Sequence, residues 1–438
     1  MTYGEVVGPV PSQSATDAEA TSLYARVTWR VVPILCAGFL IAYIDRANVG
    51  FAKLQMLGDL KFSESAYGLG AGLFFLGYIL FEIPSNIALR HVGARAWIGR
   101  IMISWGVLSG ATMFASTPGA FYTLRFLLGV AEAGFFPGVL YYFTIWYPAK
   151  RRSRITALFM LGIPLSGMVG SPLSGWIMTD FQGFLGLAGW QWLFLVEAIP
   201  AIGLGVIICL ALPSSIAGAK WLTEDEKRYL AEELEGDLSA GDVHLLLGAL
   251  KDMRIWLVGV IDCAILFGMY AIIFWLPTIV RGTGLISLKS NGLVTAVPHL
   301  AGIVAMIAVG WSSDRLRERR WHVALPMMMA AAAFAASGAF SGNLTATIVL
   351  FAIANAGLVG ALPPLLCIPG TFLRGAAAAA GLALVSSIGN LAGLTSTYLI
   401  GRLMDTGHTA GPALAVFAAF LVVGALVTLG LPAKLVNR

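Results

Sequence analysis

Val31-Val-Pro-Ile-Leu-Cys-Ala-Gly-Phe-Leu-Ile-Ala-Tyr-Ile44 is an uncharged stretch that ends at two adjacent charged residues, Asp45 and Arg46. A helix needs about 20 mostly apolar residues to cross roughly 30 Å of hydrocarbon, and the stretch with its flanks, 29–49, is long enough. A charge at the bilayer centre costs about 2.5–3.5 kcal/mol on insertion scales, so such charges usually face a polar cavity. The stretch therefore predicts a membrane-spanning helix that carries a functional polar site.

The composition extends this prediction to the whole chain. Of its 438 residues, 58% are hydrophobic and 12% are charged, and the mean hydropathy is +0.82. Soluble domains carry about 25% charged residues. We expect an all-α membrane protein, because a span in hydrocarbon has to satisfy its own backbone hydrogen bonds. The basic residues form no patch for nucleic acid. The sequence also shows no paired metal ligands and no nucleophile motif, so we expect no enzyme activity and no bound cofactor.

Twelve apolar segments are long enough to cross a bilayer. They are 29–49, 67–89, 97–116, 119–142, 154–178, 190–212, 255–279, 291–311, 321–340, 345–366, 376–402 and 412–432. A polar connection at 213–254 separates the first six from the last six. The predicted organisation is a tail (1–28), a six-helix bundle (29–212), a central loop (213–254), a second six-helix bundle (255–432) and a tail (433–438). Within the loop, Thr223 and Glu226 have capping-box spacing, which predicts a charged amphipathic helix from Thr223 to Leu234. This helix is interpreted as a solvated linker, with a tether on the membrane surface as the alternative.

The distribution of Lys and Arg predicts the orientation. Loops on one side hold 21 of the 28 basic residues. Arg46 and Arg125 lie within spans, and the other side holds five, namely Lys53, Lys61, Arg281, Lys289 and Arg402. Cytoplasmic loops carry the excess of Lys and Arg, so both termini are expected in the cytoplasm. The short loop and tails favour a bacterial inner membrane.

Two loops share a sequence pattern at equivalent places in the two predicted bundles. One reads Gly310-Trp-Ser-Ser-Asp314-Arg315, and the other Ser85-Asn-Ile-Ala-Leu89-Arg90-His-Val-Gly93-Ala-Arg95. Repeats between six-span halves are typical of transporters. The pattern is similar to the GxxxDRxGRR signature of the major facilitator superfamily, although Leu89 stands in place of the aspartate in the first half. The resemblance implies two pseudo-symmetric six-helix bundles and alternating access. It also assigns Arg90, Arg95, Asp314 and Arg315 to the cytoplasmic gate.

Longer strings resemble one subgroup of that superfamily, the anion:cation symporters, which include bacterial permeases for tartrate, galactonate, phthalate, hydroxyphenylacetate and nicotinate. The main matching strings are Tyr43-Ile-Asp45-Arg46-Ala-Asn48-Val-Gly50, Gly77-Tyr78-Ile-Leu-Phe-Glu82-Ile-Pro84 and Arg125-Phe-Leu-Leu-Gly129-Val-Ala-Glu132-Ala-Gly-Phe-Phe-Pro137. The resemblance implies that Asp45 and Glu132 carry protons and that Arg46 and Arg125 interact with the anion and with these acids. It further implies that Tyr78 donates to the substrate and that Asn390 lines the cavity.

The residue types fit this chemistry. Arg125 and Glu132 are seven residues apart in the fourth span, which is two helical turns and about 10 Å on one face, with Gly129 between them. Arginine stays protonated and offers a carboxylate two parallel hydrogen bonds. In the resembled fold the first and fourth spans line one cavity, so two arginines and two carboxylates are expected there. The alternative is that these are buried ion pairs that only fix helix packing.

Other polar and aromatic residues are weaker candidates. Tyr270 and Trp275 are candidates for stacking an aromatic substrate, with packing as the alternative. His299 lies within a span, where an imidazole can titrate. Glu82 and Glu197 are interpreted as gate or packing residues, and Asp262 has no assigned role. For Gly162-Ile-Pro164 and the small residues after it, we expect close helix packing.

The sequence therefore predicts a monomeric secondary transporter in the lipid bilayer. Its expected function is proton-coupled uptake of a small organic anion, with the proton as the coupling ion. The arginines favour a carboxylate as that anion. Two alternatives stay open: an organic-anion exchanger of the same fold, and a transporter-like nutrient sensor.

Overall fold

Helices form along the apolar segments of the chain. The structure, a computed structural model, describes residues 17–235, 251–340, 342–373, 375–406 and 410–437, and these residues form helices and no strand. The first part of the chain contains α1 (Asp17–Leu60), α2 (Glu64–Val92), α3 (Ala94–Ala111), η1 (Thr112–Phe114), α4 (Pro118–Glu132), α5 (Phe135–Trp146), α6 (Ala149–Met160), α7 (Gly162–Asp180), η2 (Phe184–Gly186), α8 (Gly189–Ala211) and α9 (Glu224–Glu235). The second part contains α11 (Met253–Gly282), α12 (Leu288–Leu316), α13 (Arg320–Ser337), η3 (Gly338–Phe340), α14 (Leu344–Cys367), α15 (Pro369–Phe372), α16 (Gly375–Asp405), α17 (Ala410–Gly430) and α18 (Ala433–Val436). Residues 1–16 of the predicted tail, 236–250 of the predicted loop and the loop arginine Arg374 lie outside the described residues.

The twelve predicted spans fall on these helices. The segment 119–142 covers α4 and α5, 154–178 covers α6 and α7, and each other span falls largely on one long helix. Among the described residues, ten helices are long and apolar enough to cross a membrane. The third and eleventh predicted spans, α3 and α16, are not among the ten. Helix α3 carries Arg95 and Arg100 within its 18 residues.

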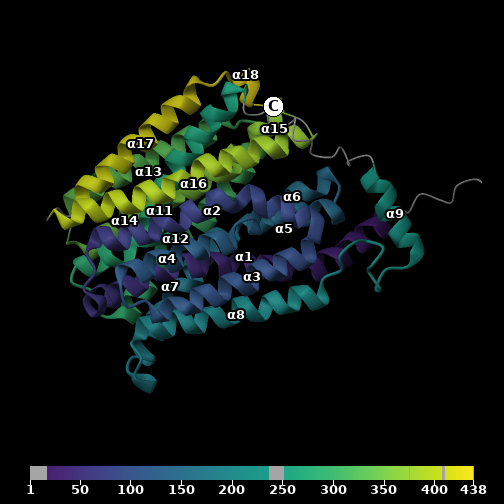
Figure 1. The fold of residues 1–438 in the computed structure, drawn as a ribbon. Coiled ribbons are helices and arrows are strands. Elements are labelled where there is room, and N and C mark those ends of the chain that lie inside the picture. The colour runs from purple at the N-terminus through teal and green to yellow at the C-terminus, as the bar shows by residue number, and fades with distance from the viewer. Residues whose placement is uncertain (1–16, 236–250, 341, 374, 407–409, 438) are drawn as a thin grey trace, which may run out of the picture.

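The helices of the two halves pack in the same pattern. In the first half α1 packs on α7 and α8, α2 on α4, and α3 on both α4 and α8. In the second half α11 packs on α16 and α17, α12 on α14, and α13 on both α14 and α17. Each contact recurs six spans later, so the predicted repeat is present in the packing. Figure 1 shows α3 and α8 along one edge of the bundle and α13 and α17 along the other.

Three helix pairs join the halves. Helix α2 packs along α16, α7 along α12, and α1 along α11. Small residues allow the close approach: a Cβ on Gly175 of α7 would collide with the carbonyl of Leu288, and a Cβ on Gly292 of α12 would collide with the carbonyl of Ser171. On the other side of α7, Gly162 lies against Phe39 of α1. The expected role of the glycine- and proline-rich segment in helix packing is therefore confirmed.

Helix α9 packs against the first half, so its interpretation as a solvated linker was wrong. The capping box is present, since the Glu226 N–H donates to Thr223 Oγ1 (3.3 Å) and the Thr223 N–H donates to Glu226 Oε2 (3.0 Å). Leu230 is fully buried. Arg26 of α1 pairs with Glu226, and Tyr24 donates to Glu233 (3.2 Å). Figure 1 shows α9 beside the beginning of α1, at one end of the bundle.

This docking is expected to weaken in acid. Partial burial alone would raise the pKa of Glu226, but its bonds with Thr223 and Arg26 outweigh burial and hold the pKa below the ordinary 4.5. A lowered pKa means that the stabilisation is present above pH 4.5 and is lost as the pH falls through the lower value of the folded state. We therefore expect the backbone amides of α9 to exchange hydrogen faster at pH 3.5 than at pH 7, after correction for their intrinsic exchange rates. Glu226→Gln should remove that difference, while the exposed Glu224→Gln should retain it.

Candidate functional site

Helix α1 sends its two adjacent charges in different directions. Neighbouring residues on a helix point about 100° apart. Arg46 points toward α2 and α4, where it pairs with Glu132. Asp45 points toward α3, where it accepts hydrogen bonds from Trp105 Nε1 (2.6 Å) and Ser109 Oγ (3.0 Å). The charges expected in one site are therefore divided between two neighbouring sites.

The Arg46 guanidinium lies buried among aromatic rings. Its Cζ is 4.7 Å from the ring centre of Tyr43, 5.0 Å from that of Phe74 and 5.7 Å from that of Tyr78. Aromatic faces attract cations, more strongly where water is excluded. Arg46 is 7% exposed and Glu132 is 3% exposed. The Nε atom of Arg46 has no hydrogen-bond partner among the described residues, so this cation can still accept an additional ligand.

Glu132 stands at a break in the fourth span, which the sequence had indicated as one continuous helix. Helix α4 ends at Glu132, Gly134 adopts φ 86°, and α5 begins at Phe135. The freed carbonyl of Ala133 accepts a hydrogen bond from Ser85 Oγ (2.6 Å), and Ser85 Oγ accepts one from Trp97 Nε1 (3.0 Å). Transporter binding sites often use such broken helices. Ser85, which stands where the loop signature has its first glycine, therefore donates to the carbonyl that the helix break leaves free beside the site.

Arg125 lies two turns before Glu132 on α4, but Glu132 pairs with Arg46. The Arg125 side chain is fully buried, with its Cζ 5.2 Å from the Phe74 ring centre. Its Nε and Nη2 atoms have no hydrogen-bond partner among the described residues. Gly129, between Arg125 and Glu132, lies so close to the carbonyl of Phe74 that a Cβ would collide, which brings α2 and α4 into backbone contact. Arg125 is thus a second buried cation next to the Arg46–Glu132 pair.

The second half contributes Tyr270 and Asn390 across from Arg46. The Tyr270 hydroxyl donates to Asn390 Oδ1 (3.0 Å), which links α11 to α16. The Tyr270 ring centre is 4.4 Å from that of Phe75 in α2, and the Phe75 ring centre is 6.0 Å from Arg46 Cζ. These two residues therefore form the opposite wall of the Arg46 site.

Trp275 lies away from this wall, in a cluster that closes the end of the bundle at the α1–α2 turn. Its ring centre is 3.7 Å from Lys53 Nζ, and Lys53 pairs with Glu64 (2.5 Å). Asp405 at the end of α16 accepts from the N–H groups of Glu64 (2.9 Å) and Ser65 (3.0 Å). We call this cluster the outer closure. It also contains the Lys289–Asp180 ion pair (2.6 Å) and a hydrogen bond that Arg281 Nη1 donates to the Leu54 carbonyl (2.5 Å). Apart from the Lys53–Glu64 pair, these contacts join the two halves, at the end that the distribution of Lys and Arg predicts to lie outside.

We expect Asp405→Asn to open the outer closure. The carboxylate binds two N–H groups of the other half at the first turn of α2, where a negative charge also interacts favourably with the helix dipole; an asparagine keeps one acceptor and loses the charge. Spin labels at Gly58→Cys and Ile286→Cys, in a background with the native cysteines replaced, should show a longer mean distance. Asp59→Asn is the matched control, because Asp59 accepts from Trp190 within one half (2.8 Å). Equal distance distributions in the two variants would contradict the assignment.

The four predicted gate residues lie at the opposite end. Asp314 pairs with Arg319 (2.6 Å) and Arg315 lies over the Trp311 ring (5.1 Å), both within the second half. Arg95 donates to the Leu212 carbonyl (3.4 Å) within the first half. Arg90 lies in the last turn of α2, on the same side. The contacts of Asp314, Arg315 and Arg95 each stay within one half, unlike those of the outer closure.

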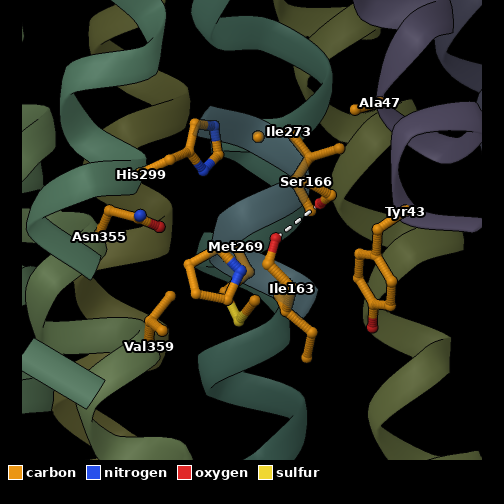
Figure 2. Close-up of a pocket in the computed structure, with 11 residues that line it drawn as sticks. Tyr43, Ala47, Ile163, Ser166, Met269, Ile273, His299, Asn355 and Val359 are labelled. Atoms are coloured by element: carbon orange, nitrogen blue, oxygen red, sulfur yellow. Dashed lines mark hydrogen bonds between the residues drawn. The ribbon is translucent and has the colours of Figure 1, made fainter. Parts of the chain in front are cut away.

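A small cavity adjoins the Arg46 site behind Tyr43. Its volume of about 10 Å³ is room for about one water molecule. Figure 2 shows His299 of α12 and Asn355 of α14 on one side, Tyr43 on the other, and Ser166 of α7 between them. The His299 ring packs directly on Gly167, where a Cβ would collide. The sequence indicated His299 as a candidate, whereas Ser166 and Asn355 gave no signal.

Two further buried acids lie along α16. Glu82 of α2 accepts from Ser387 Oγ (3.1 Å), and Asp262 of α11 lies against Gly389.

Sequence reasoning missed Asn48, Trp105 and Ser109 around Asp45. Asn48 is one helical turn after Asp45 and could have been found from that spacing, whereas the two α3 residues could not.

The paired halves and the buried charges between them define a membrane transporter. A family model described as Major Facilitator Superfamily matches residues 35–397, and the chain belongs to that family of transporters, which are not enzymes. A protein of Pseudomonas putida named "Putative metabolite transport protein NicT" is 53% identical over 97% of this chain and 98% of its own length. A "Putative tartrate transporter" of Agrobacterium vitis is 44% identical over 93% of this chain and 94% of its own. The xylose transporter XylE from E. coli, in a partially occluded inward-open conformation, superposes with a TM-score of 0.73 at 13% identity, covering 92% of this chain and 98% of that one.

Proposed function

We propose that this transporter imports a small organic anion, a carboxylate, together with protons by alternating access. The observation that carries the proposal is the buried Arg46–Glu132 pair within its aromatic surround. A buried cation with one intramolecular carboxylate partner is a site that a second carboxylate can compete for. The named relatives support the substrate class, since the Agrobacterium vitis protein carries a tartrate transporter's name.

Competition for Arg46 supplies a physical basis for coupling. When Glu132 is ionised, it occupies the guanidinium. When Glu132 takes up a proton, its charge is lost and Arg46 is left as a buried cation without a counterion, which is costly unless another anion binds. Proton binding therefore favours anion binding, and the same linkage requires anion binding to favour proton binding.

The remaining site residues have supporting roles in this proposal. Tyr78 and Tyr270 place hydroxyl-bearing rings around the cation, Asn390 lies against Tyr270, and Arg125 adds positive charge that favours the anion. Trp275 belongs to the outer closure, and we propose that it seals the entrance and does not touch the substrate. The Arg90, Arg95, Asp314 and Arg315 loops are proposed to brace the cytoplasmic side when it closes.

We further propose that the carrier works as a monomer in a bacterial inner membrane, with both termini in the cytoplasm and without a nucleic-acid partner. The excess of basic residues in loops on one side supports this orientation. The bacterial relatives support the location.

A thermal-shift screen tests the substrate class. A ligand that binds only the folded carrier stabilises it by about 2.7 kcal/mol at 100 times its Kd. We expect carboxylates such as L-tartrate, gluconate or benzoate to raise the melting temperature of the purified protein, and Arg46→Gln to lose this response while keeping its own unliganded transition. Stabilisation by neutral sugars or organic cations alone would contradict the proposal.

A further inference from the structure

Asn48 connects two buried carboxylates that have no cation partner among the described residues. Asn48 Nδ2 donates to Asp45 Oδ1 (3.4 Å), and the same amide approaches Glu197 of α8. Ser174 Oγ of α7 donates to Glu197 Oε1 (3.2 Å). Exposure is 2% for Asp45, 1% for Asn48 and 4% for Glu197. These residues form one polar chain, which runs from α3 through α1 to α8 and α7.

Two buried atoms of this polar chain have no hydrogen-bond partner among the described residues, and a proton on one of them would satisfy both. Asn48 Oδ1 is a buried acceptor without a donor, and Glu197 Oε2 is a buried oxygen without a donor. Unsatisfied buried polar atoms are costly and require an explanation. A proton on Glu197 Oε2 would turn that oxygen into a donor, and Asn48, whose side chain approaches Glu197, carries the amide oxygen still to be satisfied.

The surrounding charges point the same way. Trp105 and Ser109 of α3 and Ser174 of α7 face the chain as neutral donors. The charged groups that act on Asp45 are Glu132 and Arg125 of α4, and the charged group that acts on Glu197 is Asp45. Arg46 is occupied by Glu132 on the other side of α1. Among the described residues, Arg125 forms no ion pair with Asp45, and no cation is among the groups that act on Glu197, so the two buried carboxylates are not expected both to stay ionised.

We propose that Glu197 is a proton-carrying residue of the transport cycle, which shares one proton with Asp45 across Asn48. The inference rests on the proposed function, and it adds a second proton site to the Glu132 site. With the outer closure formed, the proton resides on Glu197 Oε2 and donates to Asn48 Oδ1. When the site opens to the cytoplasm, Glu197 Oε2 gives this proton to water, and the carboxylate that remains accepts from Ser174 and from the Asn48 amide. The proton site and the anion site then lie on two faces of α1, so that movement of this helix affects both.

Transport in proteoliposomes separates a proton role from a structural one. L-tartrate is the probe anion. In Glu197→Gln, uptake driven by an acid-outside pH gradient should fall at least about 10-fold. Tartrate counterflow at equal pH should stay within about 2-fold of the wild type, because exchange needs no net proton movement. Ser174→Ala leaves the carboxyl in place and should keep most of the gradient-driven uptake. Glu224→Gln, on the exposed face of α9, is the matched control for the substitution itself. Loss of both activities, or of neither, in Glu197→Gln would overturn the inference.

A substrate-free measurement keeps the inference separate from the proposed function. Infrared spectra of the purified carrier at neutral pH should contain a protonated-carboxyl C=O band that is missing from Glu197→Gln or Asp45→Asn and unchanged in Glu224→Gln. An unchanged band in both site variants would overturn the inference. If the wild type shows no gradient-driven uptake but the band disappears as expected, then the proposed coupling fails and the proton site stands.

Discussion

Replacing Arg46 by lysine is expected to reduce the initial rate of anion uptake by about 100-fold, because a lysine lacks the planar fork that binds a carboxylate and stacks on aromatic rings. The positive charge is retained, so the loss would come from geometry. Arg46 lies among Tyr43, Phe74 and Tyr78 and pairs with Glu132. A lysine's compact ammonium cannot contact all of these at once. Radiolabelled L-tartrate uptake in proteoliposomes, normalised to inserted protein, measures the effect.

The control for this variant is Arg254→Lys. Arg254 pairs with Asp252 (2.9 Å) at the start of α11, with its side chain 47% exposed, so the same substitution there should leave uptake within about 2-fold, as surface ion pairs contribute little. A thermal transition close to that of the wild type would exclude misfolding of Arg46→Lys. Uptake by Arg46→Lys within about 3-fold of the wild type would show that the fork and the stacking do not matter.

Glu132→Gln is expected to bind the anion more tightly and to lose the pH dependence of binding. Glutamine has nearly the same shape as glutamate but does not compete as an anion for Arg46. In the wild type, acid should strengthen anion binding, because a protonated Glu132 releases Arg46; in the variant, binding should be tight at all pH values. At pH 8 we expect the Kd to fall about 10-fold, which corresponds to a competing interaction of about 1.4 kcal/mol. Isothermal titration with L-tartrate between pH 5 and pH 8 measures this.

The same variant should fail to concentrate the anion in a pH gradient, because the proton that exchanges with the anion at Arg46 can no longer be released and regained there. Glu64→Gln is the matched control, because it also removes the charge of a carboxylate that pairs with a buried cation. That cation is Lys53, which lies in the outer closure and not in the Arg46 site. Weaker anion binding in Glu132→Gln would favour the alternative in which the Arg46–Glu132 pair only fixes the packing of α1 on α4.

Much of the fold could be predicted because span length and apolarity are local properties of the sequence. The break after Glu132 could not, since Ala133 and Gly134 resemble the many small residues of neighbouring spans. A helix break at this place needs a donor for the freed Ala133 carbonyl, and that donor, Ser85 Oγ, is known only from the structure. The docking of α9 was missed because the partner of Glu226 is Arg26, 200 residues away.

The sequence predicted which residues form the candidate site better than it predicted which of them pair. The helical spacing of Arg125 and Glu132 is correct, but their rotation relative to α1 decides which arginine meets the glutamate. The angular separation of Asp45 and Arg46 follows from helix geometry. The donors that α3 supplies to Asp45 depend on how α3 packs beside α1. Lys53 was counted as an outer loop cation, whereas the structure buries it beneath Trp275.

The most direct test of proton-coupled anion uptake is the effect of a protonophore on accumulation. Proteoliposomes that contain the wild-type carrier, with an acidic outside and an alkaline inside, should accumulate radiolabelled L-tartrate at least about 10-fold above its external concentration, as expected for a linked proton and anion. A protonophore should collapse this accumulation to equilibrium while counterflow continues. Uptake that is unchanged by the protonophore would contradict the account and favour an organic-anion exchanger.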